Sequence, residues 1–423
     1  MDGNIRVLVL QTLVSQLGFG MLYVVWQPYI LTTGTDVIGL GVIQSVINLS
    51  TAAGLIAWGA LSDRFGRKPV ILASNTLRLV ALAALISSGS FAFLMIFAFF
   101  MGFSSLFMQT NPARSALISE SVTGAKRATA FSTILAVGQV INTLTASAGG
   151  YLAITTGYLP IFYVCILGDA AGLTILYTSL KETLKPEDRS EPASGVSTRV
   201  TMKTVARYIV PEKGFLPLYL LMLVNGVGYG TGYSLFYGTL VDAYGFTPFQ
   251  LGLLSTSFSL VWAVSSIPFG RLSDRLGRLP FLKASWLMAL VTVAGFLGFR
   301  SFEAFFLFNM VSALDVSFWL GAWTSYVAES TSSTRLSTLL GKLDSYIRLA
   351  GIPAPWLAGL LYSSYGFYAP LAGQLVCQVL SGVLLFSLRE AEKPRGQTIV
   401  PPLVPMGPGS PSPRPKPQLQ WVP

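Results

Sequence analysis

The chain contains no histidine, only two cysteines and few charged residues. Charged side chains make up 11% of its 423 residues, whereas ordinary soluble domains carry about 25%. Without histidine, the chain lacks the commonest metal ligand and the usual proton relay near neutral pH. It also contains no nucleophile elbow, phosphate loop or zinc-ligand spacing. We therefore expect no enzymatic activity, no metal site and no cofactor.

Long apolar runs take the place of a charged surface. Hydrophobic residues make up 52% of the chain, and stretches of about 20 apolar residues are long enough to cross a bilayer. Such stretches predict an all-α, multi-pass membrane protein. They lie at 6–32, 38–61, 69–88, 90–118, 127–154, 158–181, 214–241, 248–270, 280–299, 302–328, 334–363 and 367–388. Cys165 and Cys377 fall inside two of these spans, so no disulfide is expected.

The net charge of +10 is concentrated on one side of the expected membrane. Lysine and arginine gather in the loops after the second, fourth, eighth and tenth spans, whereas the opposite loops hold Asp36, Asp242 and Glu303 with a single cation. Positively charged loops face the cytoplasm, so both termini are expected to be cytoplasmic, in a plasma-membrane protein. The basicity then reports topology, and nucleic acid is not an expected partner.

Two polar segments lie outside the spans. Residues 182–213 would form a cytoplasmic linker between an N-terminal half (1–181) and a C-terminal half (214–390). Part of this linker, Val200–Val210, has helical periodicity and could lie along the membrane surface. Residues 391–423 are rich in proline, glycine and basic residues, which predicts a disordered tail. A polyproline ligand is the alternative for this tail.

An eleven-residue segment occurs twice. Residues 59–69 (GALSDRFGRKP) and 270–280 (GRLSDRLGRLP) share eight identities at a shift of 211 positions, half the chain. A membrane protein with this symmetry has two homologous halves, and transporters bind their cargo between such halves. The pattern of Gly, Asp-Arg and Gly-Arg-basic after the second span resembles the signature of the major facilitator superfamily. The resemblance extends over about residues 5–390.

That resemblance implies twelve transmembrane helices in two pseudo-symmetric six-helix bundles. It also implies that the charges of the motif latch the bundles together in the outward-facing state, with Arg67 and Arg278 paired to Glu120 and Glu329. Leu279 replaces a basic residue in the second copy, so its latch should be weaker. Anchoring of the loops is the alternative role for these charges. The gating set is Gly59, Asp63, Arg64, Gly66, Arg67, Lys68, Glu120, Arg127, Gly270, Asp274, Arg275, Gly277, Arg278, Glu329 and Arg335.

Charged residues inside the spans point to function, because burying a charge in lipid is costly. Asp315 lies near the middle of the tenth span with Trp319 one turn later. The resemblance places the first, fourth, seventh and tenth helices around the central cavity, so Asp315 is the expected cation or proton site. Arg348 is the expected anion site. Two structural alternatives are an intrahelical pair of Asp344 with Arg348 and a pair of Asp315 with Lys342 or Arg348.

Amide and tyrosine side chains on the first, fourth and seventh spans complete the expected cavity. Those on the seventh span recur at four-residue steps between glycines, and interhelix packing is their alternative role. Arg78 and Asp169, in the third and sixth spans, are expected to be structural. The substrate and coupling set is Gln16, Tyr23, Gln27, Gln109, Asn225, Tyr229, Tyr233, Asp315, Trp319, Asp344 and Arg348.

The chain departs from the drug–proton antiporters of this family at two places. Residues 145–150 keep only the final glycine pair of the motif usual in their fifth helix, and Ala98 stands where an arginine is usual in their fourth. Both departures weaken the resemblance to antiporters. Proton coupling would then depend on Asp315.

These features predict a secondary active transporter that works by alternating access. Proton-coupled efflux of small amphipathic compounds is the leading interpretation. Uptake of an organic anion or another small metabolite, by symport or facilitated diffusion, is the alternative. A transport-dead membrane sensor or scaffold is an alternative of another class. The expected partners are a small-molecule substrate, the lipid bilayer and protons, and a monomer is expected.

Overall fold

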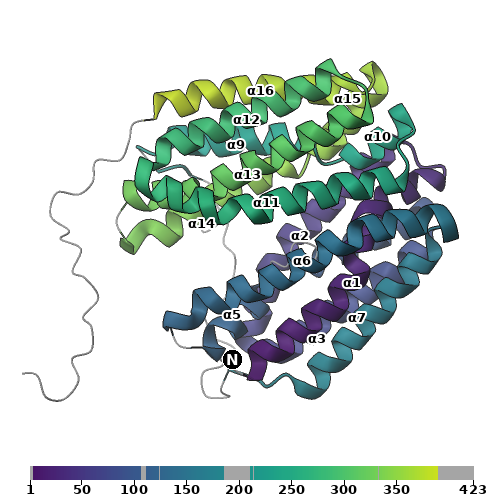
Figure 1. The fold of residues 1–423 in the computed structure, drawn as a ribbon. Coiled ribbons are helices and arrows are strands. Elements are labelled where there is room, and N and C mark those ends of the chain that lie inside the picture. Colours follow the sequence, from purple (N-terminus) through teal and green to yellow (C-terminus); the bar gives the residue numbers. More distant parts are fainter. Residues whose placement is uncertain are drawn as a thin grey trace, which may run out of the picture.

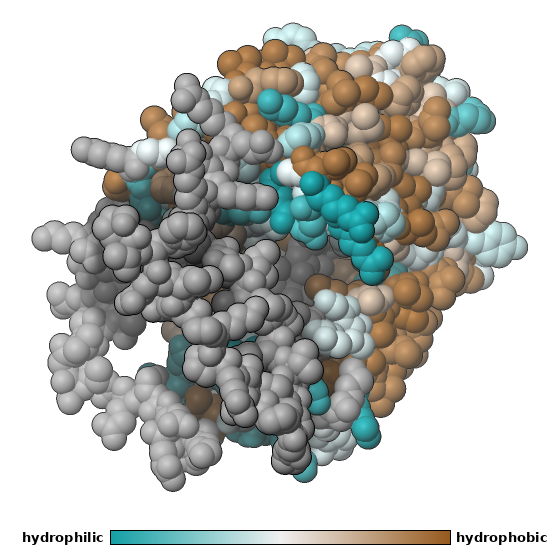
Figure 2. Space-filling model, turned by 60° about the vertical axis from the view of Figure 1, so that its left-hand side comes forward, coloured by the Kyte–Doolittle hydropathy of each residue, from teal (hydrophilic) through white to brown (hydrophobic). Residues whose placement is uncertain are grey.

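The computed structural model describes residues 3–105, 111–122, 124–184, 210–212, 214–331 and 333–388. The regular structure of these residues is entirely helical, and nine of their helices are long and apolar enough to cross a membrane. Where these helices are visible in Figure 2, the surface is largely apolar. The expected surface helix of the linker and the proline-rich tail lie outside the described residues.

The helices form two bundles, one from each half of the chain (Figure 1). The first bundle contains α1 (Gly3–Thr32), α2 (Val37–Phe65), α3 (Arg67–Ile86), α4 (Phe91–Phe103), α5 (Pro112–Ser121), α6 (Gly124–Thr156) and α7 (Leu159–Ser179). The second contains α9 (Leu216–Gly232), α10 (Phe236–Tyr244), α11 (Pro248–Leu276), α12 (Arg278–Gly298), α13 (Phe302–Ser330), α14 (Ser333–Gly351), α15 (Ala354–Tyr365) and α16 (Tyr368–Ser387).

Twelve spans account for these helices, because three spans each consist of two consecutive helices. The apolar pattern predicts these twelve spans but not the interruptions in the fourth, seventh and eleventh of them. In the fourth span α4 ends at Phe103, and Ser105 has a φ of 54°. In the seventh, alternate glycines of low helix propensity precede the end of α9. In the eleventh, Pro353 separates α14 from α15, because proline cannot continue the helical hydrogen bonding.

The repeated motif folds as the same corner in both halves. Gly66 lies between α2 and α3 with a φ of 105°, and Gly277 lies between α11 and α12 with a φ of 101°. Side chains other than glycine rarely adopt this backbone conformation. The glycine in each copy therefore reverses the chain tightly, and the Asp and Arg on either side of it come close together.

The two bundles touch along only part of their length. We call the end that carries residues 59–69 and 270–280 the motif end, and the opposite end the far end. The bundles meet toward the far end, near α10, and diverge toward the motif end, near α5 and α14 (Figure 1). Gln27 of α1 donates to the Ser234 carbonyl (2.7 Å) and accepts from the Gly238 N–H (2.9 Å). Asn48 of α2 donates to the Gly351 carbonyl (2.6 Å).

Glycines allow the backbones of the two bundles to meet at this interface. A Cβ atom added to Gly41 of α2 would lie 2.5 Å from the carbonyl oxygen of Pro355. One added to Gly252 of α11 would lie 2.7 Å from the carbonyl oxygen of Ala146 on α6. Gly150 of α6 meets the start of α11 in the same way. Side chains larger than hydrogen do not fit these close approaches.

Candidate functional site

A cavity of about 200 Å³ lies inside the C-terminal bundle, among α9, α12, α13, α14 and α16. Its walls are mostly apolar and aromatic, with a few polar groups, as is usual for small-molecule sites. The cavity reaches from the surface of the bundle, where Leu320 is 55% exposed, to its interior, where Asp315 is 3% exposed. It consists of Leu221, Asn225, Tyr229, Ser285, Trp286, Ala289, Asp315, Val316, Trp319, Leu320, Ile347, Gln378, Ser381 and Leu385.

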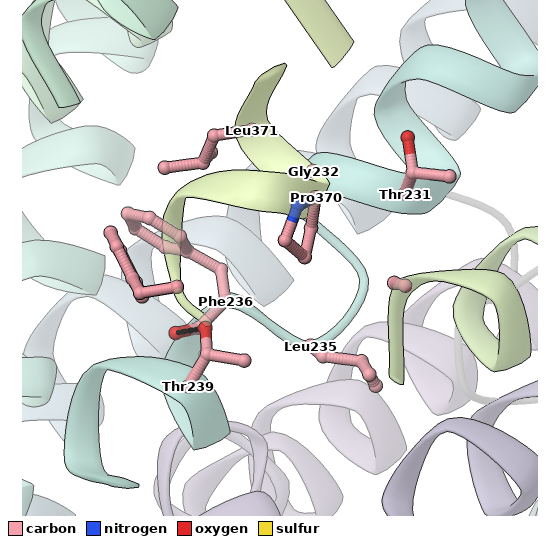
Figure 3. Close-up of a pocket in the computed structure, with 9 residues that line it drawn as sticks. Thr231, Gly232, Leu235, Phe236, Thr239, Pro370 and Leu371 are labelled. Atoms are coloured by element: carbon pink, nitrogen blue, oxygen red, sulfur yellow. Dashed lines mark hydrogen bonds between the residues drawn. The ribbon is translucent and has the colours of Figure 1, made fainter. Parts of the chain in front are cut away.

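A second cavity lies at the break between α9 and α10 (Figure 3). Its volume is about 10 Å³, which is room for about one water molecule. Leu235, Phe236 and Pro370 give it largely apolar walls, and the Thr239 hydroxyl donates to the Phe236 carbonyl (3.0 Å). This cavity is too small for a substrate, so the larger one is the candidate site.

Asp315 is held by hydroxyl groups from two other helices. Its Oδ1 accepts a hydrogen bond from Ser285 of α12 (2.6 Å), and its Oδ2 accepts one from Tyr229 of α9 (2.5 Å). These hydroxyls fix the direction of the carboxylate but bring no positive charge. A buried carboxylate with neutral partners is costly to ionise, so this site is suited to a proton or to a cationic group.

Lys342 and Arg348, the two cations that could have paired with Asp315, are paired with other carboxylates. Lys342 pairs with Glu212 at 2.9 Å, and Arg348 pairs with Asp344 at 2.7 Å. The structural alternative in which Asp315 pairs with Lys342 or Arg348 is therefore wrong. The intrahelical pair is present, with side chains 41% and 58% exposed. Charges this exposed would be costly in lipid, so we expect this side of α14 to face water.

The structure brings together four of the residues expected to bind substrate. Asn225, Tyr229, Asp315 and Trp319 all line the larger cavity. Ser285, Gln378 and Ser381 join them, and the Ser381 hydroxyl donates to Asn225 (2.7 Å). These three were not identified from the sequence, because they lie on the ninth and twelfth spans and the resemblance names only the first, fourth, seventh and tenth helices as lining the cavity. Their polarity within apolar runs is the signal that points to them.

Other expected site residues lie outside this cavity. Tyr233 donates to Ser312 (3.0 Å), and Tyr23 of α1 packs edge-on against Tyr237 of α10, across the two bundles. Gln27 also joins the bundles, as described above. Gln16 lies on α1 and is not part of the cavity lining. Gln109 lies outside the described residues.

A buried arginine in the N-terminal bundle was not found from the sequence. Arg114 of α5 is 6% exposed and donates to Gln11 (3.0 Å) and Thr12 of α1. A cation within the expected span 90–118 is the signal that points to it. Nearby, Arg78 of α3 and Asp169 of α7 form a buried ion pair. Their contact lies within one bundle, where the sequence predicts a structural role.

The first copy of the motif forms a charged cluster at the motif end. Arg67, at the start of α3, binds Asp63 of α2 (2.5 Å) and Glu120 of α5 (2.9 Å). Arg127 of α6 donates to the Ser119 carbonyl (2.9 Å). The cluster thus connects helices of one bundle, and none of these contacts reaches the other bundle in this structure.

The second copy repeats this cluster in the C-terminal bundle. Arg278, at the start of α12, binds Asp274 of α11 and Glu329 of α13 (3.1 Å). The side chain of Arg335 lies outside the described ones. As in the first copy, these ion pairs stay within one half of the chain. The latch between bundles that the resemblance implies is therefore not closed in this conformation.

Glu182, just after α7, completes the first cluster. Its carboxylate accepts from the backbone N–H groups of Arg67 (2.9 Å) and Lys68 (3.0 Å) at the N-terminus of α3, where a negative charge is favourable. Partial burial acts to raise the pKa of Glu182. Hydrogen bonds from these two groups and from the N–H groups of Thr183 and Leu184 outweigh it and hold this pKa below its usual value.

Replacing Glu182 with glutamine should weaken this corner in a pH-dependent way. Because the folded-state pKa is lowered, the stabilisation is complete above the unfolded-state pKa and is lost as the pH falls through the folded-state value. We expect E182Q to melt about 2 °C below wild type at pH 7. The difference should shrink as the pH falls below about 4. Thermal unfolding in detergent across this range measures it, and a pH-independent difference would contradict the capping role.

Comparisons with known proteins agree with this architecture. The family model of the Major Facilitator Superfamily matches residues 8–237 and 218–415. Solute carrier family 22 member 18 of Rattus norvegicus is 23% identical over 345 residues, which cover 80% of this chain and 83% of that protein. The multi-drug resistance efflux pump PmrA of Streptococcus pneumoniae serotype 4 is 23% identical over 354 residues, covering 82% and 85%.

A solved structure supports the same fold. The crystal structure of the human organic anion transporter MFSD10 (TETRAN) has a TM-score of 0.64 to this chain at 19% identity, and the match covers 90% of this chain and 99% of that one. The repeated motif and the two bundles of six spans agree with these matches. The chain therefore belongs to the major facilitator superfamily of membrane transporters.

Proposed function

We propose that this transporter exports small amphipathic compounds in exchange for protons. The proposal rests on Asp315, a buried carboxylate whose hydrogen-bond donors among the described residues are both hydroxyl groups, in a cavity with aromatic and apolar walls. A cationic amphipathic solute suits such a site. Its positive group would lie at Asp315, and its apolar part would contact Trp286 and Trp319.

Proton coupling follows from competition for one carboxylate. Asp315 binds either a proton or the positive group of the solute, because the second would leave an uncompensated positive charge in a buried site. A proton arriving from the acidic side releases the solute there. Loss of the proton on the other side prepares the carboxylate for the next solute molecule. An exchange of this kind needs no further ionisable group.

The repeated motif would control which side is open. With the motif end in the cytoplasm, as the positively charged loops favour, this conformation faces inward. Asp63 and Asp274 are 63% and 62% exposed at the motif end. We propose that these clusters hold the bundles together when the motif end closes, in the outward-facing state, and that their separation opens the cytoplasmic side.

Similarity to the human organic anion transporter favours a second candidate, transport of an organic anion. A basic group would then have to hold the anion. Arg348 is the cation expected from the sequence for that role, but it is already paired with Asp344. Similarity to the pneumococcal efflux pump and the isolated carboxylate of Asp315 favour the export of cationic compounds instead.

The proposed function can be tested with purified protein in proteoliposomes that are acidic inside. The probes are 1-methyl-4-phenylpyridinium, an aromatic cation with no exchangeable proton, and naphthalene sulfonate, an aromatic anion. We expect the pH gradient to drive accumulation of the cation, and a protonophore to abolish it. Protein-dependent movement of the sulfonate alone, in either direction across the vesicle membrane, would favour the second candidate. Movement of neither probe above protein-free vesicles would contradict both.

A further inference from the structure

The polar core of the N-terminal bundle carries an excess positive charge. Arg78 and Asp169 form a buried ion pair and neutralise each other. Arg114 adds a third charge, and no carboxylate among the described residues lies within ion-pair distance of it. Its hydrogen-bond partners, Gln11 and Thr12, are neutral. A buried guanidinium with neutral partners alone is unfavourable unless an anion compensates it.

Arg114 lies near the start of α5, buried inside the N-terminal bundle. It precedes Glu120 of the motif-end cluster by six residues, which is about 9 Å along a helix axis. At 6% exposure it differs from a surface arginine, whose charge is solvated by water. The undescribed stretch nearest in sequence, residues 106–110, is LFMQT and contains no acid. The acid nearest to Arg114 along the chain is Glu120, and it pairs with Arg67.

The guanidinium of Arg114 keeps a donor that is open to a ligand. Its two terminal nitrogens donate to Gln11 and Thr12, whereas its Nε donates to none of the described residues. Buried polar atoms without a partner in this bundle include Arg78 Nε and Asp169 Oδ2, but no nitrogen of Arg114. The Nε of Arg114 is therefore not enclosed. A planar guanidinium with free N–H groups is the side chain best suited to a carboxylate.

The neutral partners hold this guanidinium in place. Gln11 accepts from Arg114 and donates to Ser15 (3.0 Å) one turn later on α1. The side chain of Asn111 accepts from the Arg114 backbone N–H (3.4 Å) at the start of α5. Gln11 and Thr12, both on α1, bind the two terminal nitrogens, and Asn111 fixes the backbone at the start of α5, so the guanidinium is oriented before a ligand arrives. A preorganised group loses less conformational entropy when it binds.

We propose that Arg114, with Gln11 and Thr12, forms a binding site for a small anion in the N-terminal bundle. The ligand is a monovalent anion such as a halide or a carboxylate, and its charge compensates the guanidinium. It is either a free ion such as chloride or the acidic group of a transported solute. The protein then has an anion site in one bundle and, at Asp315, a cation or proton site in the other. This inference does not depend on which compound is exported.

Thermal unfolding of the full-length protein in detergent tests this site. The buffer contains a bulky sulfonate as its only anion, and chloride or benzoate replaces it at constant ionic strength. A ligand that binds only the folded state raises the melting temperature with concentration. We expect a saturable rise of several degrees in wild type. A rise with chloride indicates a free ion, and a rise with benzoate alone indicates a solute acid group.

Variants then locate the site. Arg114→Gln removes the charge and leaves a shorter, neutral polar side chain, so the anion-dependent rise should disappear. Arg271→Gln removes an exposed arginine of α11 in the other bundle and should retain the rise. If Arg114→Gln does not fold, Arg114→Lys keeps the charge without the planar fork and should show a reduced rise. No anion-dependent rise in wild type, or an unchanged rise in either Arg114 variant, would overturn the proposal.

Discussion

Asp315→Asn is expected to abolish proton-driven export of the aromatic cation, lowering its rate by at least about 100-fold. Asparagine has nearly the same shape and can still bond to Ser285 and Tyr229, which hold the native carboxylate at 2.6 and 2.5 Å. It has no negative charge and takes up no proton. The variant should therefore lose both the attraction for the cation and the competition that couples it to protons. Accumulation in acid-loaded proteoliposomes measures the loss.

Glu303→Gln is the matched control, because it makes the same chemical change on the same helix. Glu303 lies in the first turn of α13 and is exposed at the far end. Its transport should stay within about twofold of wild type, as is usual for surface substitutions away from a site. Proton-driven accumulation that persists in Asp315→Asn would remove Asp315 from the mechanism. Equal losses in both variants would mean that the effect is not specific to the cavity.

Stability separates loss of function from loss of fold in this experiment. An ionised carboxylate buried among neutral groups opposes folding, and asparagine removes that charge while keeping the packing. The melting temperature of Asp315→Asn in detergent should therefore equal or exceed that of wild type. A large fall would instead indicate that Asp315 is a structural group, and the transport result would then have to be reinterpreted.

Much of the fold follows from local features of the sequence. The two copies of the motif predict two equivalent corners, because Gly66 and Gly277 can adopt a positive φ that other residues rarely adopt. The length of the apolar runs predicts the spans. Hydropathy averaged over a span does not detect the breaks in the fourth, seventh and eleventh spans. Residue types signal two of them, because alternate glycines precede the end of α9 and Pro353 separates α14 from α15.

The site was less accessible to sequence reasoning, because a cavity is a product of packing. Asp315 could be found, since a charge in the middle of a span is costly and therefore informative. Its partner Ser285 lies on the ninth span, which is not among the helices that the resemblance places around the cavity, and a single serine in an apolar run carries little signal. Arg114 is a different case. It was not identified from the sequence, although a charged residue inside a predicted span is as informative there as it is for Asp315.

The second prediction with a large expected effect on transport concerns the glycines at which the backbones of the two bundles meet. Gly252→Leu should prevent the far end from closing, because an added Cβ would lie 2.7 Å from the carbonyl oxygen of Ala146 on the other bundle. Helix α11 itself can still form, since leucine has a high helix propensity. The substitution therefore penalises one conformation rather than the fold. We expect transport to fall at least about 10-fold through a shift of population toward the open far end.

A cross-link between α2 and α15, at another contact between the bundles, measures how often the far end is closed. It does so away from any local packing effect at residue 252. The backbone N–H of Trp356 donates to the Ser45 hydroxyl (3.1 Å), where α15 meets α2. Cysteines at these two positions, with Cys165 and Cys377 replaced by alanine, should form a disulfide efficiently when the far end is closed. Gly252→Leu should reduce this cross-linking.

The control for this experiment is Gly298→Leu, near the far end of α12. An added Cβ at Gly298 meets nothing within 4 Å, so this variant should leave cross-linking and transport unchanged. If Gly252→Leu lost transport while cross-linking stayed as in wild type, the bundles would still close, and the effect would lie in local packing. Loss of both in Gly252→Leu alone would mean that the two contacts open together. One contact joins α11 to α6 and the other joins α15 to α2, so they involve different helices of both bundles. Their joint opening therefore requires each bundle to move as a rigid body, which is the motion that alternating access needs.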